Sequence, residues 1–162
     1  GKRVLVLGAG GAARAIAGEL GLAGAKHLTV TNRDPDKART IAALVADNTP
    51  CGAEVMAWDG EISVPEGTDI VINATSIGLG DAQALPPIRL ETLRRGMVVA
   101  DVIPNPPMTH LLRKARAQGC TVLYGLGMLV NQGVIGVELW LGRKLDSGVM
   151  QRTLQEIFGV SD

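Results

Sequence analysis

Aromatic residues are almost missing from this chain. Its 162 residues include two Trp, one Tyr and one Phe, or 2% aromatics, although 46% of the residues are hydrophobic. A core of this composition must be filled by Ala, Val, Leu and Ile, and the apolar content excludes a disordered chain. Twenty-one glycines supply the tight turns and close packing that an α/β protein uses. The composition therefore predicts one folded domain of ordinary size.

The chain also has only two cysteines, no formal net charge and no long hydrophobic run. Cys51 and Cys120 are far apart, with no CxxC pair and no zinc-ligand spacing, so we expect reduced thiols in a cytoplasmic protein without a metal. Lys and Arg number 16 together, as do Asp and Glu, which excludes a global field that would attract nucleic acid or a membrane. No apolar run reaches the about 20 residues of a membrane span, and the first residues do not resemble a signal peptide. Because the chain starts with Gly1 rather than Met, we expect a piece of a longer protein.

Short apolar runs alternate with helical patterns along the chain. Strands are predicted over 3–7, 28–31, 53–58, 69–73, 97–101 and 121–124, and helices over 11–22, 36–46, 110–118, 128–141 and 148–158. Asp34 suits the N-cap of the second helix, and Thr109 that of the third. This alternation predicts a Rossmann-type α/β fold over residues 1–162, with a doubly wound, parallel, six-stranded sheet and helices on both faces. Right-handed crossovers give the strand order 3-2-1-4-5-6.

A glycine-rich turn follows the first predicted strand. Residues 8–13, GAGGAA, match the pattern G-x-G-x-x-G/A between a strand and a helix, which is the context that such a motif requires. Gly8 allows a sharp turn, Gly10 lets the backbone approach a pyrophosphate, and Ala13 lets the helix pack close to the strand. The free N–H groups and dipole of the helix N-terminus favour phosphate. The turn predicts a dinucleotide site.

The end of the second predicted strand bears on the choice of dinucleotide. An NAD site commonly has Asp or Glu there for the ribose 2′-hydroxyl, whereas this chain has Asn32 followed by Arg33. Arg33 and Lys37 would attract a 2′-phosphate, and Asp34 would oppose it unless it caps the helix. We expect NADP rather than NAD, with NAD as the alternative.

Five segments in order resemble the nucleotide-binding domain of the shikimate dehydrogenase family. They are GAGGAARAI, NRDPDKA, NATSIGL, DVIPNPPMTHLL and GLGMLVNQG, and the likeness covers nearly all of the chain. The resemblance implies an NADP-dependent oxidoreductase of the shikimate pathway, in aromatic amino-acid biosynthesis, that reduces 3-dehydroshikimate to shikimate. It also implies a missing N-terminal domain that carries the catalytic residues and shares the ring-acid substrate with this one. The fragment alone should then be inactive.

The same resemblance assigns roles to individual positions. The pyrophosphate would bind at Gly8, Ala9, Gly10, Gly11 and Ala12, and the adenosine phosphate at Asn32, Arg33, Asp34 and Lys37. The nicotinamide end would meet Thr75, Ser76, Val102, Gly125 and Met128, and Gln132 would reach the substrate. His27, His110, Asp101 and Glu138 are expected to be surface or structural residues, so no catalytic residue is assigned to this chain.

Pro104 departs from the family pattern, which commonly has a substrate-touching Tyr at this position. The exact substrate therefore stays open. The alternatives are an NAD-preferring quinate or shikimate dehydrogenase, a reductase of another compound such as an amino-shikimate, and a non-catalytic module that senses a nucleotide or quinate.

Overall fold

The structure is a computed structural model that describes residues 1–159; residues 160–162 of the predicted domain lie outside the described residues. α-Helices follow four of the six strands, as the sequence pattern predicts. The strands are β1 (Arg3–Leu7), β2 (His27–Asn32), β3 (Gly52–Ala57), β4 (Ile70–Asn73), β5 (Val98–Asp101) and β6 (Thr121–Leu123). The helices are α1 (Gly11–Leu22), α2 (Pro35–Asn48), α3 (His110–Ala117), α4 (Leu126–Leu141), α5 (Ser147–Phe158) and the short 3-10 turn η1 (Leu90–Thr92).

All strands form one parallel sheet in the order β3-β2-β1-β4-β5-β6, which confirms the predicted fold class and topology. Strand β1 lies inside the sheet, where Val4 faces Leu28 of β2 on one side and Ile70 of β4 on the other. The chain turns one way after β1 and the opposite way after β4. Ligands of such sheets bind at this switch point, outside the carboxyl ends of the strands.

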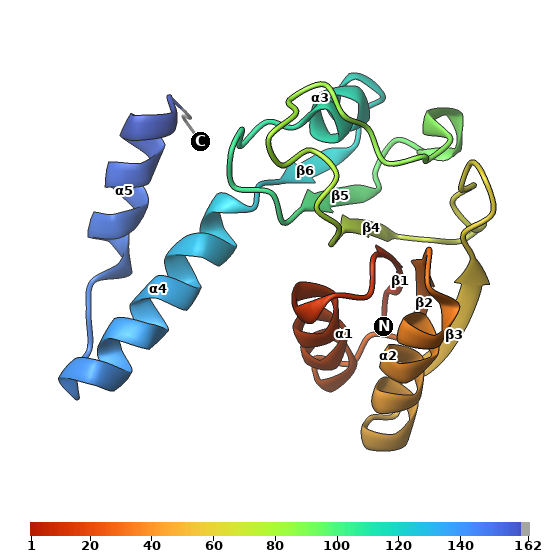
Figure 1. Cartoon of the computed structure of the whole chain (residues 1–162), viewed down its shortest axis with the longest axis horizontal. Coiled ribbons are helices and arrows are strands. Elements are labelled where there is room, and N and C mark those ends of the chain that lie inside the picture. The colour runs from red at the N-terminus through yellow and green to blue at the C-terminus, as the bar shows by residue number, and fades with distance from the viewer. Residues whose placement is uncertain (160–162) are drawn as a thin grey trace.

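The two faces of the sheet carry separate cores, because alternate residues of a strand point to opposite sides. Helices α1 and α2 cover one face, where Ala13, Ala17 and Ile41 pack on Val4 and Val6. Helix α3 covers the other face with Leu111, Leu112 and Ala115, which pack in the same core as Leu5 and Leu7. In Figure 1, α1 and α2 lie below β4, β5 and β6, and α3 lies above β5 and β6. The small alanines let α1 approach the sheet closely.

Helices α4 and α5 pack against each other and extend away from the sheet (Figure 1). Helix α4 begins at Leu126, two residues before the predicted start, and ends at Leu141, where its C-cap Gly142 has the left-handed conformation. Several large apolar side chains on this pair are solvent-exposed: Ile135, Leu139, Trp140, Leu141, Val149 and Ile157. No helix among residues 1–159 has both the length and the apolar character for crossing a bilayer.

Candidate functional site

The glycine turn follows β1 and lies between the carboxyl ends of β2 and β4. Gly8 has φ +105°, and its N–H donates a hydrogen bond of 2.8 Å to the carbonyl of Thr31. A Cβ on Gly8 would lie 2.7 Å from the carbonyl oxygen of Ala74, so both the conformation and the space require glycine. Gly10 is the N-cap of α1 and has no side chain that could accept hydrogen bonds from the first N–H groups of the helix. The first N–H groups of α1 are therefore available to an anion.

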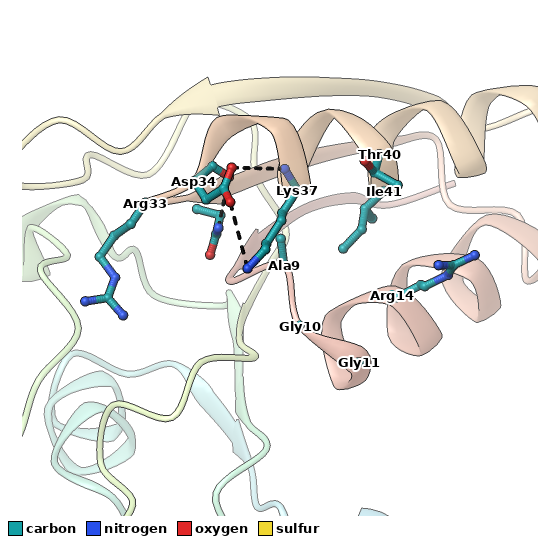
Figure 2. Close-up of a pocket in the computed structure, with 10 residues that line it drawn as sticks. Ala9, Gly10, Gly11, Arg14, Arg33, Asp34, Lys37, Thr40 and Ile41 are labelled. Atoms are coloured by element: carbon teal, nitrogen blue, oxygen red, sulfur yellow. Dashed lines mark hydrogen bonds and ion pairs between the residues drawn. The ribbon is translucent and has the colours of Figure 1, made fainter.

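A hollow of about 640 Å³ opens beside this turn. Figure 2 shows that its walls come from the turn, from α1, from the end of β2 and from α2. Most of the residues predicted for the pyrophosphate and the adenosine phosphate meet here: Ala9, Gly10, Gly11, Asn32, Arg33, Asp34 and Lys37. Gly8 and Ala12 do not line the hollow. Arg14, Thr40 and Ile41 line it as well and were not predicted from the sequence.

Asp34 caps α2, as predicted, at the rim of this hollow. Its Oδ1 accepts hydrogen bonds from the N–H groups of Asp36 at 3.1 Å and Lys37 at 3.4 Å. Its Oδ2 lies 3.8 Å from Lys37 Nζ. The Asn32 amide donates to the Asp34 carbonyl at 2.9 Å, which holds the turn after β2. The carboxylate is therefore engaged by α2, and it neutralises part of the Lys37 charge.

Arg14 and Arg33 contribute the other positive charges of the hollow. Within residues 1–159, neither guanidinium has an ion-pair partner, and both side chains are exposed. In Figure 2 Lys37 extends from α2 toward the glycine turn, whereas Arg33 points away from Lys37. The hollow thus holds three cations and one carboxylate beside an open helix N-terminus, and this arrangement fits a ligand with several phosphates.

The positions predicted for the nicotinamide end lie beyond the turn, toward β4 and β5. Thr75 adjoins the glycine turn, since a Cβ on Gly8 would lie 3.0 Å from Thr75 Cγ2. The Val102 N–H donates to the Asn73 carbonyl at 3.0 Å, which joins the ends of β5 and β4. Gly125 packs directly on the Val102 backbone, and a Cβ there would overlap its carbonyl group. The structure therefore brings Thr75, Val102 and Gly125 to the same end of the sheet.

Ser76, Met128 and Gln132 are exposed side chains, and none of them lines the hollow. Met128 and Gln132 are four residues apart on α4, so they share one face of that helix. Their assignment to the nicotinamide ring and to the substrate stays a prediction.

The other titratable residues have structural contacts away from the hollow. Glu138 accepts a 2.8 Å hydrogen bond from the Leu145 N–H and pairs with Lys144 at 3.1 Å, and these contacts lower the pKa of Glu138. His110 Nδ1 lies 2.7 Å from the Gln83 carbonyl, a partner that the sequence did not indicate. His27 lies 3.3 Å from Glu54 at the far end of β2. No group of three or more potential metal ligands occurs among residues 1–159.

Two family models match this chain. "Shikimate / quinate 5-dehydrogenase" matches residues 1–78, and "Shikimate 5'-dehydrogenase C-terminal domain" matches residues 125–155. The chain belongs to the shikimate dehydrogenase family. The shikimate dehydrogenase (NADP(+)) of Moorella thermoacetica is 40% identical to it over 163 residues, which cover 99% of this chain and 55% of that relative.

Solved structures of similar sequence have the same architecture. The ligand-free 5-ketofructose reductase of Gluconobacter sp. strain CHM43 is 66% identical, with a TM-score of 0.90, over 98% of this chain and 57% of the other. Quinate dehydrogenase from Corynebacterium glutamicum in complex with NAD is 30% identical, with a TM-score of 0.85, over 96% and 55%. This chain therefore spans about half the length of the relatives that it matches.

Proposed function

We propose that this chain is the cofactor-binding domain of an NADP-dependent oxidoreductase. The observation that carries the proposal is the hollow where the uncapped N-terminus of α1 meets Arg33, Lys37 and Arg14. The α1 end and the glycine turn would hold the pyrophosphate, and the cations would hold the 2′-phosphate. When bound, NADPH supplies the hydride. The chain itself binds the cofactor and orients it, through Thr75, Ser76, Val102, Gly125 and Met128 at the nicotinamide end.

The contacts of the Asp34 carboxylate favour NADP over NAD. A carboxylate that faced the ribose would repel a 2′-phosphate, but this one is engaged by two N–H groups of α2 and by Lys37. Arg33 stays free to bind the phosphate. The name of the Moorella relative agrees with NADP, whereas the quinate dehydrogenase complex with NAD keeps the NAD alternative open.

Two substrates are supported by the relatives. Reduction of 3-dehydroshikimate to shikimate is the reaction that the resemblance of the sequence motifs implies, and the 40% identical relative is named a shikimate dehydrogenase. The higher identity of 66% favours 5-ketofructose instead. Pro104 agrees with a changed substrate, because it replaces the Tyr common in the family. Gln132 would contact either substrate from α4.

The catalytic residues would lie in a further domain, because the chain spans 55–57% of the relatives' lengths. Leu139 and Trp140 on α4 are 78% and 84% exposed, and a second domain packed there would cover them.

Burial raises the pKa of both free thiols, at Cys51 and Cys120. Unreactive, unpaired cysteines suit a reducing compartment, and we place the protein in the cytoplasm.

Titration of the chain with NADPH and NADH, followed by fluorescence, tests the cofactor assignment. NADPH should bind about tenfold tighter than NADH, which is the difference in binding free energy expected from one charge-assisted hydrogen-bond pair. Equal or tighter binding of NADH would contradict the cofactor assignment.

The substrate is tested on the full-length protein that contains this chain, with 3-dehydroshikimate and 5-ketofructose offered in parallel with NADPH. Turnover of neither compound, with NADPH bound, would leave a binding module as the better description.

A further inference from the structure

A cluster of buried polar side chains lies at the carboxyl ends of β4 and β5. Asn73 and Asp101 are direct neighbours in the sheet register, and Thr109 precedes α3 beside them. Their exposed fractions are 0%, 3% and 2%. Buried polar groups are retained only when hydrogen bonds satisfy them, so their partners define what the cluster does.

Asp101 accepts hydrogen bonds from three directions. Its Oδ1 accepts from the Asn73 amide at 3.0 Å and from the Ile103 N–H at 3.1 Å, and its Oδ2 accepts from the Thr109 hydroxyl at 2.8 Å. The Thr109 hydroxyl oxygen in turn accepts from the Leu112 N–H at 3.3 Å, which caps α3. Burial raises the pKa of Asp101, and the three hydrogen bonds act against that rise. All three partners are donors, so the ionised carboxylate is the form that they satisfy.

Asn73 connects Asp101 to the loop that follows β4. Its Oδ1 accepts from the Thr75 N–H at 3.2 Å and from the Thr75 hydroxyl at 2.7 Å. Its Nδ2 donates to Asp101 and to the Ile77 carbonyl at 3.2 Å. A carboxylate can only accept, so Asp101 determines which end of the amide faces it and leaves the oxygen for Thr75. The orientation of Asn73 therefore depends on the charge of Asp101.

We propose that Asp101 is a positioning residue, which through Asn73 and Ile103 holds residues 75–77 and 102–103 where the nicotinamide half of the cofactor binds. The inference rests on the proposed function of this chain. Two of the three segments predicted for the nicotinamide end, at Thr75 and at Val102, are tied to one carboxylate, whereas the adenosine half would bind at the α1 and α2 ends of the hollow. With 3% exposure, Asp101 acts through these neighbours rather than by touching the ligand.

Asp101→Asn tests the proposal with two probes, NADPH and adenosine 2′,5′-bisphosphate, which lacks the nicotinamide half. The variant keeps the volume of the side chain but turns an amide N–H₂ toward donors. We expect the affinity for NADPH to fall about tenfold, as for one lost charge-assisted hydrogen bond, and the affinity for the bisphosphate to stay within about twofold. A change of equal size for both probes, or no change for either, would overturn the positioning role.

Thr109→Val is a second variant, in case Asp101→Asn does not fold. Thr109 is buried behind Asp101 and cannot touch a ligand, so an effect on NADPH alone must pass through the carboxylate. Thr109→Ser is the matched control, which retains the hydroxyl and should restore wild-type affinity for NADPH. If Thr109→Val binds both probes as the wild type does, the proposal is wrong. If the wild type binds neither probe, the proposed function itself fails, and if it binds NADPH no tighter than the bisphosphate, positioning fails.

Discussion

Gly8 and Gly10 share one turn but meet different constraints. The space beside Gly8 is filled by the Ala74 carbonyl, and its φ of +105° excludes most side chains. No atom lies within 4 Å of a Cβ built on Gly10, so the protein alone does not require glycine there. Gly8 is therefore needed for the fold, and Gly10 for the approach of a ligand.

Gly10→Val should abolish NADPH binding and leave the circular dichroism spectrum of the fold largely unchanged, because the added side chain would meet the ligand rather than the protein backbone. Gly8→Ala is the matched comparison. It should lower the free energy of unfolding by about 2 kcal/mol or more, through a positive φ and a clash with backbone. Wild-type affinity for NADPH in Gly10→Val would contradict the assignment of the turn.

Arg33→Ala should remove most of the preference for NADPH over NADH. We expect a loss of about tenfold for NADPH and little change for NADH, because only the former carries the 2′-phosphate. Lys37→Ala should have the smaller effect, since its ammonium already pairs with Asp34 at 3.8 Å. Titrations at rising salt provide the control, because screening should shrink the preference of the wild type. An unchanged preference in Arg33→Ala would show that Arg14 or Lys37 binds the phosphate instead.

The glycine turn and the residues after β2 could be predicted because a local motif determines where the backbone turns. Arg14, Thr40 and Ile41 could not, although Arg14 stands four residues after Gly10 in the first turn of α1. Whether a helical side chain faces the hollow depends on the rotation of its helix on the sheet. That rotation is set by packing between distant segments, such as Ala17 of α1 against the β1 strand.

At the scale of elements, α2 begins at a residue with two opposed effects. Asp34 stabilises the helix through its cap and places a negative charge beside the phosphate site. Asp34→Ser should keep a capping oxygen, free Lys37 and raise the NADPH preference several-fold. Asp34→Ala should raise it equally but lose about 1 kcal/mol of stability with the cap. Paired thermal unfolding and titration experiments separate the two effects; a weaker NADPH preference in both variants would refute this account.

Asp69 directly precedes β4, and its side chain binds the amino end of β1. Its Oδ2 accepts from the Arg3 N–H at 2.8 Å and its Oδ1 lies 3.2 Å from Lys2 Nζ, and these contacts lower the pKa of Asp69 below the usual 3.8. A lowered folded-state pKa gives stability that is present above the unfolded value and is lost as pH falls through the folded value. Asp69→Asn should therefore melt slightly below the wild type at pH 7, and the gap should close in strong acid. A gap that is the same at both pH values would rule out the charge of Asp69 as its source.

The regular elements were predictable because apolar periodicity marks them, and the six strands lie within a residue or two of their predicted bounds. The turn Leu90–Thr92 and the bridge between Ile62 and Ile88 were not predicted. They have no repeating pattern, and they form because a long connection must cover the core around Val71 and Val99. Helix α4 starts early because Gly125 fits against the Val102 backbone, a contact between distant segments.

At the scale of the whole molecule, we expect the isolated chain to bind cofactor without turning it over. The hollow belongs to the adenosine end, and the five residues proposed for the nicotinamide end include no carboxylate, imidazole or amine for proton transfer beside a ketone: Thr75, Ser76, Val102, Gly125 and Met128. Assays with shikimate, quinate and the reduced product of 5-ketofructose, each with NADP and NAD, should show no rate above background. The full-length protein is the positive control. Steady turnover by residues 1–162 alone would mean that this chain contains catalytic residues after all.

The central place of β1 has a consequence for the making of the protein. Its partner β4 comes only at Ile70–Asn73, so one edge of β1 stays open while the intervening chain is synthesised. At a synthesis rate of about 5–20 residues per second, the N–H and C=O groups on that edge of β1 stay unpaired for several seconds. Its sequence, RVLVL, is short and mostly apolar, which favours pairing with another extended segment. Nascent chains on neighbouring ribosomes are thus most prone to aggregate before β4 emerges.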